Sequence, residues 1–324
     1  MFQPRRQNPL LMRGKCGVKT RMPVSERGVR RFESPGAAFA DAPHTQRKRV
    51  PRRLPCPVKT AIVAPLSIIS KESSMPKHIL ITGATSGFGL ATARLFASEG
   101  WHVAGTGRRA DRLDALHQEL GDAFLPVPLD MRDRHAVMET LGNLPGEWND
   151  VDVLLNNAGA ALGLDPAQEC SLDDWDAMVD TNIKGLLYAT RAVLPGMVAR
   201  NRGHIVMLGS IAGNYPYAGG NVYCGSKAFV KQFSLSLRAD LLGTNVHVTN
   251  IEPGLAESEF SIVRFHGDTE KAASVYEDTS PITPQDIAET VYWVTHRPAH
   301  ININRVEIMP ICQCPSGPLV KKGM

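Results

Sequence analysis

From residue 76 onward, short apolar runs alternate with amphipathic segments of helical period. The runs predict seven buried strands, at residues 78–82, 102–106, 124–129, 151–155, 204–208, 247–251 and 305–309. Predicted helices lie between them, including one that ends near Glu99 and others at 110–120, 183–200, 221–242 and 284–294. Strands that are apolar on both faces are typical of a parallel sheet covered by helices, and right-handed crossovers then predict one doubly wound α/β domain. The ligand of such a domain binds beyond the carboxyl ends of its strands.

The first 75 residues lack any sustained apolar period and contain scattered prolines, which predicts a disordered extension. Their longest apolar run, at 61–69, is shorter than the roughly 20 residues that cross a bilayer, so we expect no membrane span. We expect translation to start at Met75, the α/β domain to cover residues 76–312, and residues 313–324 to form a flexible tail.

Charge is divided unevenly along the chain. Residues 1–75 carry 16 Lys and Arg against 4 Asp and Glu, whereas the remainder carries 20 against 28. An acidic folded part would repel nucleic acid, so a small molecule is the expected partner. The basic clusters at 47–49 and 52–53 leave open a nucleic-acid or membrane-surface role for the extension alone.

The six cysteines lack the spacing of a zinc site or the density of a disulfide framework, which fits a reducing cytoplasm. Only Cys312 and Cys314 are close together, and two thiolates make at most half of a four-ligand site. We therefore predict no metal.

A glycine-rich turn follows the first predicted strand and opens the first helix. Such a turn lets the backbone approach a pyrophosphate, which the free N–H groups and the helix dipole then favour. The predicted cofactor-binding residues here are Gly83, Ala84, Thr85, Ser86, Gly87, Phe88 and Gly89.

Arg108 and Arg109 follow the second predicted strand, where an NAD-binding domain would usually offer a carboxylate to the ribose. Two guanidinium groups suit a 2′-phosphate and leave a bare ribose diol without its acceptor, so NADP is the expected cofactor. Weaker candidates follow the third and fourth strands: Asp130 and Met131 beside the adenine, then Asn157, Ala158 and Gly159 along the cofactor.

Ser210 ends the fifth predicted strand, and Tyr223 and Lys227 follow on one helix. Residues four apart share a helix face, so we expect the Lys227 ammonium to lower the pKa of the Tyr223 phenol from about 10 toward working pH. Tyr223 then becomes a general acid and base, while Ser210 holds the substrate oxygen.

The chain from 76 to about 312 resembles the short-chain dehydrogenase/reductase family, with a Rossmann-like fold. The motifs are TGATSGFG, NNAG, the strand-end serine, YCGSK and Pro253-Gly254. The resemblance implies that Asn182 holds a water that relays protons through Lys227. It also implies that Pro253, Gly254 and the segment from Leu255 to Phe260 line the nicotinamide side of the site.

Further segments, among them PYAGGNVY, EFSIVRF and PAHININ, are similar to the bacterial NADP-dependent 3-hydroxy acid dehydrogenases. That resemblance implies oxidation of serine, allo-threonine or 3-hydroxypropionate, reduction of malonic semialdehyde, a homotetramer and a cytoplasmic location. The segment 255–260 departs from the group because it is one residue shorter and more acidic.

Two other functions stay open at this point. A 3-oxoacyl-carrier-protein reductase would use the same catalytic residues, but it would need a basic docking surface. A non-catalytic NADP-binding redox sensor would not need the intact Ser210, Tyr223 and Lys227. For the substrate carboxylate, Arg264 and the loop 217–221 are the candidates.

Overall fold

The computed structural model describes residues 77–315, 320, 322 and 323. The chain divides into two units, residues 1–67 and 68–324, and every described residue belongs to the second. The predicted disordered extension and the predicted start at Met75 therefore lie outside the described residues, as does part of the predicted tail. No helix in the described part of the chain is long and apolar enough to cross a membrane.

Seven parallel strands form one sheet, as the alternation of apolar runs predicted. Their spatial order is β3-β2-β1-β4-β5-β6-β7, and every neighbouring pair is parallel. The strands are β1 (His78–Ile81), β2 (His102–Gly107), β3 (Phe124–Pro128), β4 (Val153–Asn156), β5 (Gly203–Leu208), β6 (Val246–Pro253) and β7 (Arg305–Ile308). The order changes direction between β1 and β4, which opens a crevice at their carboxyl ends.

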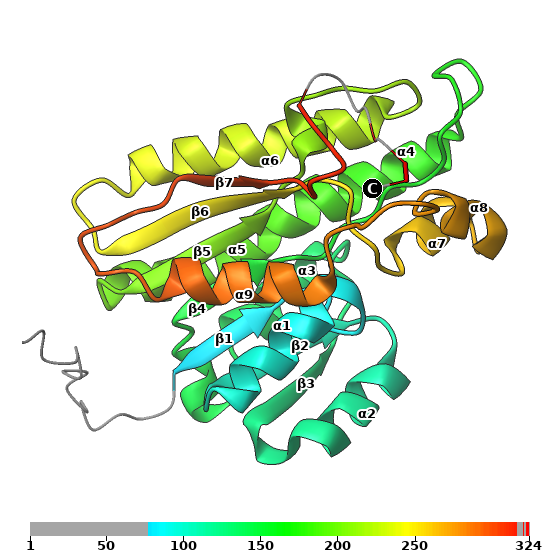
Figure 1. The fold of residues 1–324 in the computed structure, drawn as a ribbon. Coiled ribbons are helices and arrows are strands. Elements are labelled where there is room, and N and C mark those ends of the chain that lie inside the picture. The colour runs from blue at the N-terminus through cyan, green and yellow to red at the C-terminus, as the bar shows by residue number, and fades with distance from the viewer. Residues whose placement is uncertain (1–76, 316–319, 321, 324) are drawn as a thin grey trace, which may run out of the picture. The chain divides into compact units, whose positions relative to one another are not determined.

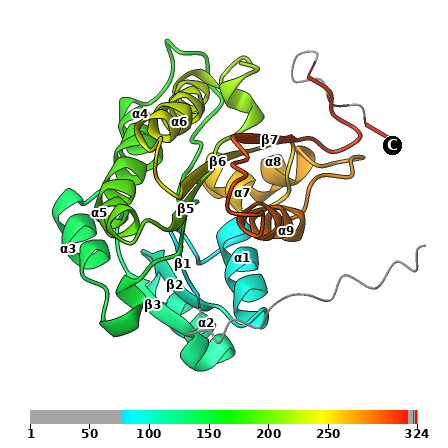
Figure 2. The ribbon, with the colours of Figure 1, turned by 90° about the vertical axis from the view of Figure 1, so that its left-hand side faces the viewer.

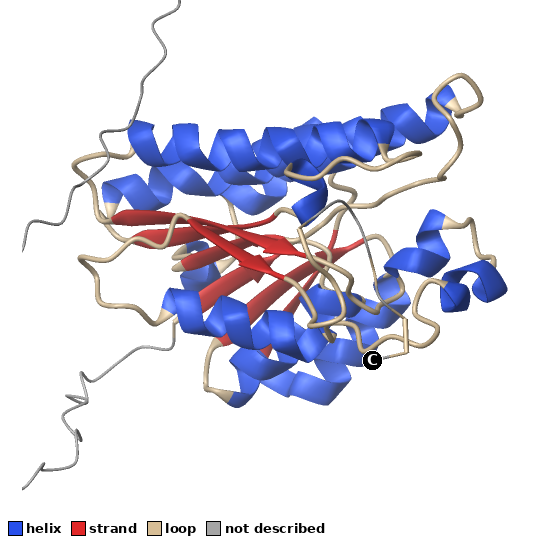
Figure 3. Ribbon diagram, turned by 45° about the horizontal axis from the view of Figure 1, so that its top comes forward, coloured by secondary structure: helices blue, strands red, loops and turns tan. Residues whose placement is uncertain are grey.

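Helices cover both faces of the sheet (Figures 1 and 2). One face carries α1 (Gly87–Ser98), α2 (Ala110–Leu120) and α9 (Pro284–Thr295), and the other carries α3 (Arg134–Gly142), α5 (Leu186–Ala199) and α6 (Asn221–Asp240). Along β1, Ile79 and Ile81 pack into the first of these layers and Leu80 into the second. Both faces of the strands are thus buried, and Figure 3 shows the sheet between its two helical layers.

Shorter elements that the apolar periodicity did not single out surround the carboxyl ends of the sheet. They are α4 (Leu172–Val179), the π-helical turn η3 (Asp180–Gly185), the 3-10 turn η4 (Ile211–Gly213), α7 (Phe260–Arg264) and α8 (Thr269–Ser274). Two further 3-10 turns, η1 (Gly121–Ala123) and η2 (Gly146–Asn149), lie before β3 and β4. Figure 1 shows α7 and α8 beyond the carboxyl ends of the strands.

Candidate functional site

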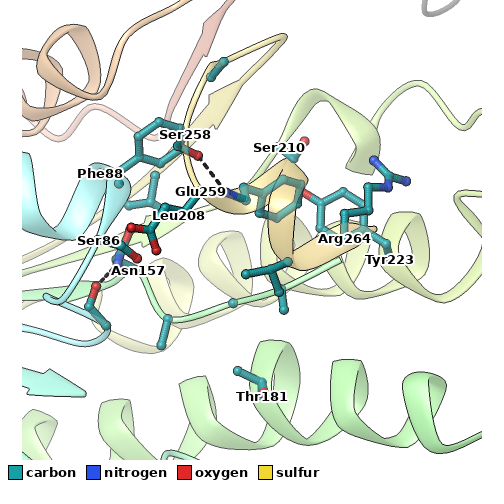
Figure 4. Close-up of a pocket in the computed structure, with 18 of the residues that line it drawn as sticks. Ser86, Phe88, Asn157, Thr181, Leu208, Ser210, Tyr223, Ser258, Glu259 and Arg264 are labelled. Carbon is teal, nitrogen blue, oxygen red and sulfur yellow. Dashed lines mark hydrogen bonds between the residues drawn. The ribbon is translucent and has the colours of Figure 1, made fainter. Parts of the chain in front are cut away.

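A cavity of about 610 Å³ lies at the carboxyl ends of the strands. Its walls come from the turns after β1, β2, β4, β5 and β6, together with α6 and α7. Figure 4 shows Ser86, Phe88 and Asn157 toward one end of it and Ser210, Tyr223 and Arg264 toward the other. The cavity therefore joins the glycine turn to the predicted catalytic residues.

The glycine turn after β1 has a backbone that only glycine accommodates easily. Gly83 and Gly87 have φ angles of +73° and +51°, in the left-handed region. A Cβ at Gly89 would collide with the carbonyl oxygen of Gly83. Ser86 precedes α1 in extended backbone and makes no side-chain cap, so the first N–H groups of the helix stay available to a phosphate.

Arg109 lies against this turn from the end of β2. Its Nη2 donates to Thr85 Oγ1 at 2.9 Å and to Ser86 Oγ at 3.1 Å. Arg108 also lines the cavity. Two guanidinium groups and two hydroxyls thus surround the space beside the first helical turn, a donor set suited to a phosphate monoester.

Glu259, from the short acidic segment after Gly254, pairs with Arg109 and with Arg112 of α2. Its carboxylate accepts from Arg109 Nη1 at 3.2 Å and from Arg112 Nη1 at 2.8 Å. Partial burial raises the pKa of Glu259, but the hydrogen bonds from Arg112 and Arg109 outweigh it and hold that pKa below its usual range. The acidic character of the segment, which set it apart in the sequence, therefore has a structural counterpart in this ion pair.

Asp130 lies at the edge of the cavity and is paired rather than free. Arg132 Nη2 approaches its Oδ2 at 2.6 Å, and this hydrogen bond holds the pKa of Asp130 below its usual range. Met131 beside it is buried and lines the cavity. A paired carboxylate and an apolar side chain can flank an adenine ring here.

Ser210, Tyr223 and Lys227 meet at the other end of the cavity. Ser210 follows β5, and its Oγ accepts from the N–H of Ala212 at 3.1 Å. Tyr223 and Lys227 come from the first turns of α6, and the Lys227 Nζ lies 5.8 Å from the centre of the Tyr223 ring. That Nζ donates to the carbonyl oxygen of Leu208 at 2.7 Å.

The pKa of Tyr223 shifts in the opposite direction to the one predicted from the sequence. Burial of the side chain is the largest cause and raises the pKa above 10, while Ser210 and Arg264 lower it by smaller amounts. Burial also lowers the pKa of Lys227 to about 8. The expectation failed because spacing on a helix does not reveal burial, and the Lys227 ammonium is directed at a carbonyl group rather than at the phenol.

Asn182 lies in the π-helical turn η3 and does not line the cavity. Its Oδ1 accepts from Ala160 N, and its Nδ2 donates to Ala160 O and to Ser226 Oγ, all within 3.0 Å. The side chain thus fixes the loop after β4 against α6. A water relay through Asn182 and Lys227 stays a prediction.

Arg264 approaches the catalytic residues from the end of α7. Its Nη2 donates to the Tyr217 hydroxyl at 2.8 Å and its Nε to Gly163 O at 3.3 Å. The guanidinium carbon lies 5.7 Å from the centre of the Tyr223 ring. The hydrogen bonds of the Arg264 side chain to described residues use Nε and Nη2, which leaves Nη1 to donate to an anion beside Tyr223.

Most of the predicted site residues share this cavity. Those that line it are Gly83, Thr85, Ser86, Gly87, Phe88, Arg108, Arg109, Asp130, Met131, Asn157, Ala158, Gly159, Ser210, Tyr223, Lys227, Pro253, Gly254, Leu255 and Phe260. Ala84 and Gly89 lie behind the wall, where they pack the glycine turn.

Sequence reasoning missed Tyr276 and Gln313 as wall residues, and it placed Glu259 in the wall without its pairing to Arg109 and Arg112. Gln313 belongs to the predicted tail, yet its Oε1 accepts from Leu255 N at 2.8 Å. Gly323 N likewise donates to Asp278 O at 2.6 Å. No pattern in the sequence pointed to Tyr276 or Gln313.

A seven-stranded parallel sheet with this cavity at its switch point is the architecture of a dinucleotide-binding oxidoreductase. The short chain dehydrogenase family matches residues 77–267. The chain belongs to that family.

Three individual proteins show how similar the chain is to particular members. It is 59% identical to the NADP-dependent 3-hydroxy acid dehydrogenase YdfG of Salmonella typhi over 240 residues, which are 74% of this chain and 97% of that one. It is 54% identical to the serine 3-dehydrogenase of Agrobacterium fabrum over 243 residues, 75% of this chain and 97% of the relative. A solved closed form of serine dehydrogenase complexed with NADP+ is 55% identical, with a TM-score of 0.73, and the match covers 76% of this chain and 99% of that structure.

The buried Lys227 should give stability a measurable dependence on pH. Its pKa is about 8 in the folded protein against 10.5 for the free side chain, so the unfolded chain binds more protons between these values. Stability at this site therefore increases as pH rises from about 8 to 10.5. Relative to Lys227→Met, the parent should gain roughly 3 kcal/mol of unfolding free energy over that range, measured by urea unfolding.

Lys184→Met serves as the control because Lys184 is exposed and its pKa is raised by a hydrogen bond to Asp180. Any trend at Lys184 should therefore have the opposite sign, with stability lost as the pH rises. Parallel curves for the parent and Lys227→Met would contradict the lowered pKa.

Proposed function

We propose that this chain is an NADP-dependent oxidoreductase that interconverts short 3-hydroxy acids and their 3-oxo acids, including malonic semialdehyde. The observation that best supports this function is a single cavity lined by the glycine turn, the arginine pair, Ser210, Tyr223 and Lys227. The names of the serine and 3-hydroxy acid dehydrogenases to which the chain is similar support this substrate class.

The cavity fits a dinucleotide with a phosphorylated ribose. Glycines at 83, 87 and 89 keep the turn open, since side chains there would be strained or would collide with neighbouring atoms. The helix N-terminus would bind the pyrophosphate, and Arg108 and Arg109 would bind the 2′-phosphate. When bound, the nicotinamide supplies the hydride acceptor or donor.

Tyr223 provides the proton transfer. Its raised pKa keeps the phenol protonated at neutral pH, which is the form needed to donate a proton to a carbonyl oxygen during reduction. In oxidation the phenolate takes the proton of the substrate hydroxyl, so that direction is favoured at higher pH. Ser210 donates to the substrate oxygen, and Ser210 and Arg264 are the groups that favour the phenolate of Tyr223. Lys227 would carry protons to and from this end of the cavity through the predicted water relay.

Tyr223→Phe tests this assignment. We expect the variant to lose at least about 10²-fold in kcat for NADPH-dependent reduction of malonic semialdehyde, because the proton donor is gone. Tyr292→Phe, a surface tyrosine bonded to Glu99 at 3.1 Å, is the matched control and should keep parent rates. Near-parent turnover by Tyr223→Phe would rule out its role. No turnover by the parent on any short 3-oxo acid would direct attention to carrier-protein substrates or to the sensor function.

Arg109 is the residue that we expect to select NADP over NAD. Arg109→Ala removes a guanidinium that already contacts Thr85 and Ser86, and a charged hydrogen bond contributes about 1.5–3 kcal/mol. The Kd for NADPH, measured by fluorescence titration, should increase at least about tenfold, while the Kd for NADH should change little. Arg94→Ala, on the outer surface of α1, is the control. Equal losses for both cofactors would contradict 2′-phosphate recognition.

Arg264 is the proposed partner of the substrate carboxylate, since its Nη1 is available beside Tyr223. Arg264→Met should raise the KM for 3-hydroxypropionate at least about tenfold, because it removes the charged hydrogen bond. The variant also loses the contacts to Tyr217 and Gly163, so a structural effect needs its own readout. Methyl 3-hydroxypropionate, which lacks the charge, provides it: its KM should stay close to the parent value. A similar increase for acid and ester would show that Arg264 only shapes the pocket.

The homotetramer and the cytoplasmic location stay predictions that rest on the resemblance to 3-hydroxy acid dehydrogenases. Gel filtration with light scattering measures the first of these directly.

A further inference from the structure

The amino ends of β1 and β2, opposite the catalytic cavity, carry two histidines on one face of the sheet. His78 and His102 are register partners in the parallel pair, so their side chains lie side by side, with ring centres 5.2 Å apart. The turn η2 places Glu147 and Trp148 next to these two histidines. The Trp148 ring stacks on His102 with centres 5.1 Å apart and covers the pair.

The ligand atoms of this cluster face one another without protein partners. One nitrogen or oxygen atom from each of His78, His102 and Glu147 lies within 4.8 Å of the others. His78 is only 5% exposed. In the described part of the chain, His78 Nε2 and His102 Nδ1 are buried and make no hydrogen bond. Buried polar atoms of this kind are costly unless something binds them.

The surroundings of the cluster favour a cation. The carboxylates of Asp152, Glu147 and Asp150 lie close enough to His78 to act on its charge, and they make the surroundings negative. Asp152 also accepts from the backbone N–H of His78 at 3.0 Å, which anchors the histidine.

We propose that His78, His102 and Glu147 form a binding site for a divalent transition metal of the zinc class. Two imidazoles and one carboxylate are the ligand set of three-ligand zinc sites, with a water completing the tetrahedron. The site is distinct from the proposed catalytic cavity because it lies at the other end of the same strands.

Binding requires only a small contraction of the cluster. Ligands at about 2.0–2.1 Å from a tetrahedral ion lie roughly 3.4 Å from one another. The two histidines are held by strand pairing, whereas Glu147 is half exposed on a surface turn and its carboxylate is 3.8 Å from His102 Nδ1. Glu147 can adjust by rotation of its side chain, and the two rings can turn about their side-chain bonds while the strands stay paired. A bound ion would fasten the turn before β4 to the starts of β1 and β2.

The test uses the full chain without an affinity tag, stripped with a chelator and titrated with ZnCl2 by calorimetry. We expect one saturable site that His102→Gln and Glu147→Gln each weaken at least about tenfold. His135→Gln, at an exposed histidine of α3, and Cys314→Ser should leave it unchanged. Titration with Co2+ provides a second readout, because a site with imidazole ligands gives visible absorption bands that should be lost in His78→Gln.

Glu147→Gln alters a surface side chain, so it keeps the experiment informative even if His78→Gln fails to fold, and circular dichroism checks each variant. Zinc should also raise the Tm of the parent but not that of His102→Gln. Zinc binding of equal affinity and stoichiometry in the parent, His102→Gln and Glu147→Gln would overturn the proposal. Absence of saturable binding by the parent would do so as well, leaving an ordered water as the occupant.

Discussion

A few hydrogen bonds between the ends of β1 and β4 hold the catalytic cavity open. Asn157 Nδ2 donates to the carbonyl oxygens of Thr82 and Gly83, each at 2.9 Å. In return, the Thr82 hydroxyl accepts from the backbone N–H groups of Asn157 and Ala158 at 3.0 Å. These bonds satisfy backbone groups that strand pairing no longer reaches, and they set the distance between two turns at the switch point. The glycine turn, the contact that Arg109 makes with it and the start of α1 all depend on that distance.

The two ends of the cavity differ in how strongly charged their side chains are. At the glycine turn, Arg109 and Arg112 are paired with Glu259 in a partly exposed setting, where a bound anion could replace that carboxylate. At the far end, burial controls Tyr223 and Lys227, raising the pKa of the phenol and lowering that of the ammonium. Both shifts favour neutral groups. The one cavity thus combines a charged end suited to phosphate recognition with a less polar end suited to proton transfer.

Local patterns in the sequence were enough to predict the strands, the glycine turn and the shared helix face of Tyr223 and Lys227, because each depends on residues close together in the chain. The ion pair of Arg109 with Glu259 joins residues 150 positions apart, and no local pattern encodes it. The wall position of Gln313 likewise depends on how the chain returns after β7. The direction of the Tyr223 pKa shift was missed for a related reason, since burial is a property of the packed structure and not of spacing.

The pairing of His78 with His102 is another contact that local sequence patterns do not predict. The two residues are 24 positions apart and become neighbours only because β1 and β2 are adjacent and in register. The same two strands carry the glycine turn and the arginine pair at their carboxyl ends. Each is only 4 to 6 residues long, so both ends belong to one rigid unit of the sheet. An ion at the amino ends would therefore act by stabilising the strands that support the cofactor, and not by taking part in hydride or proton transfer.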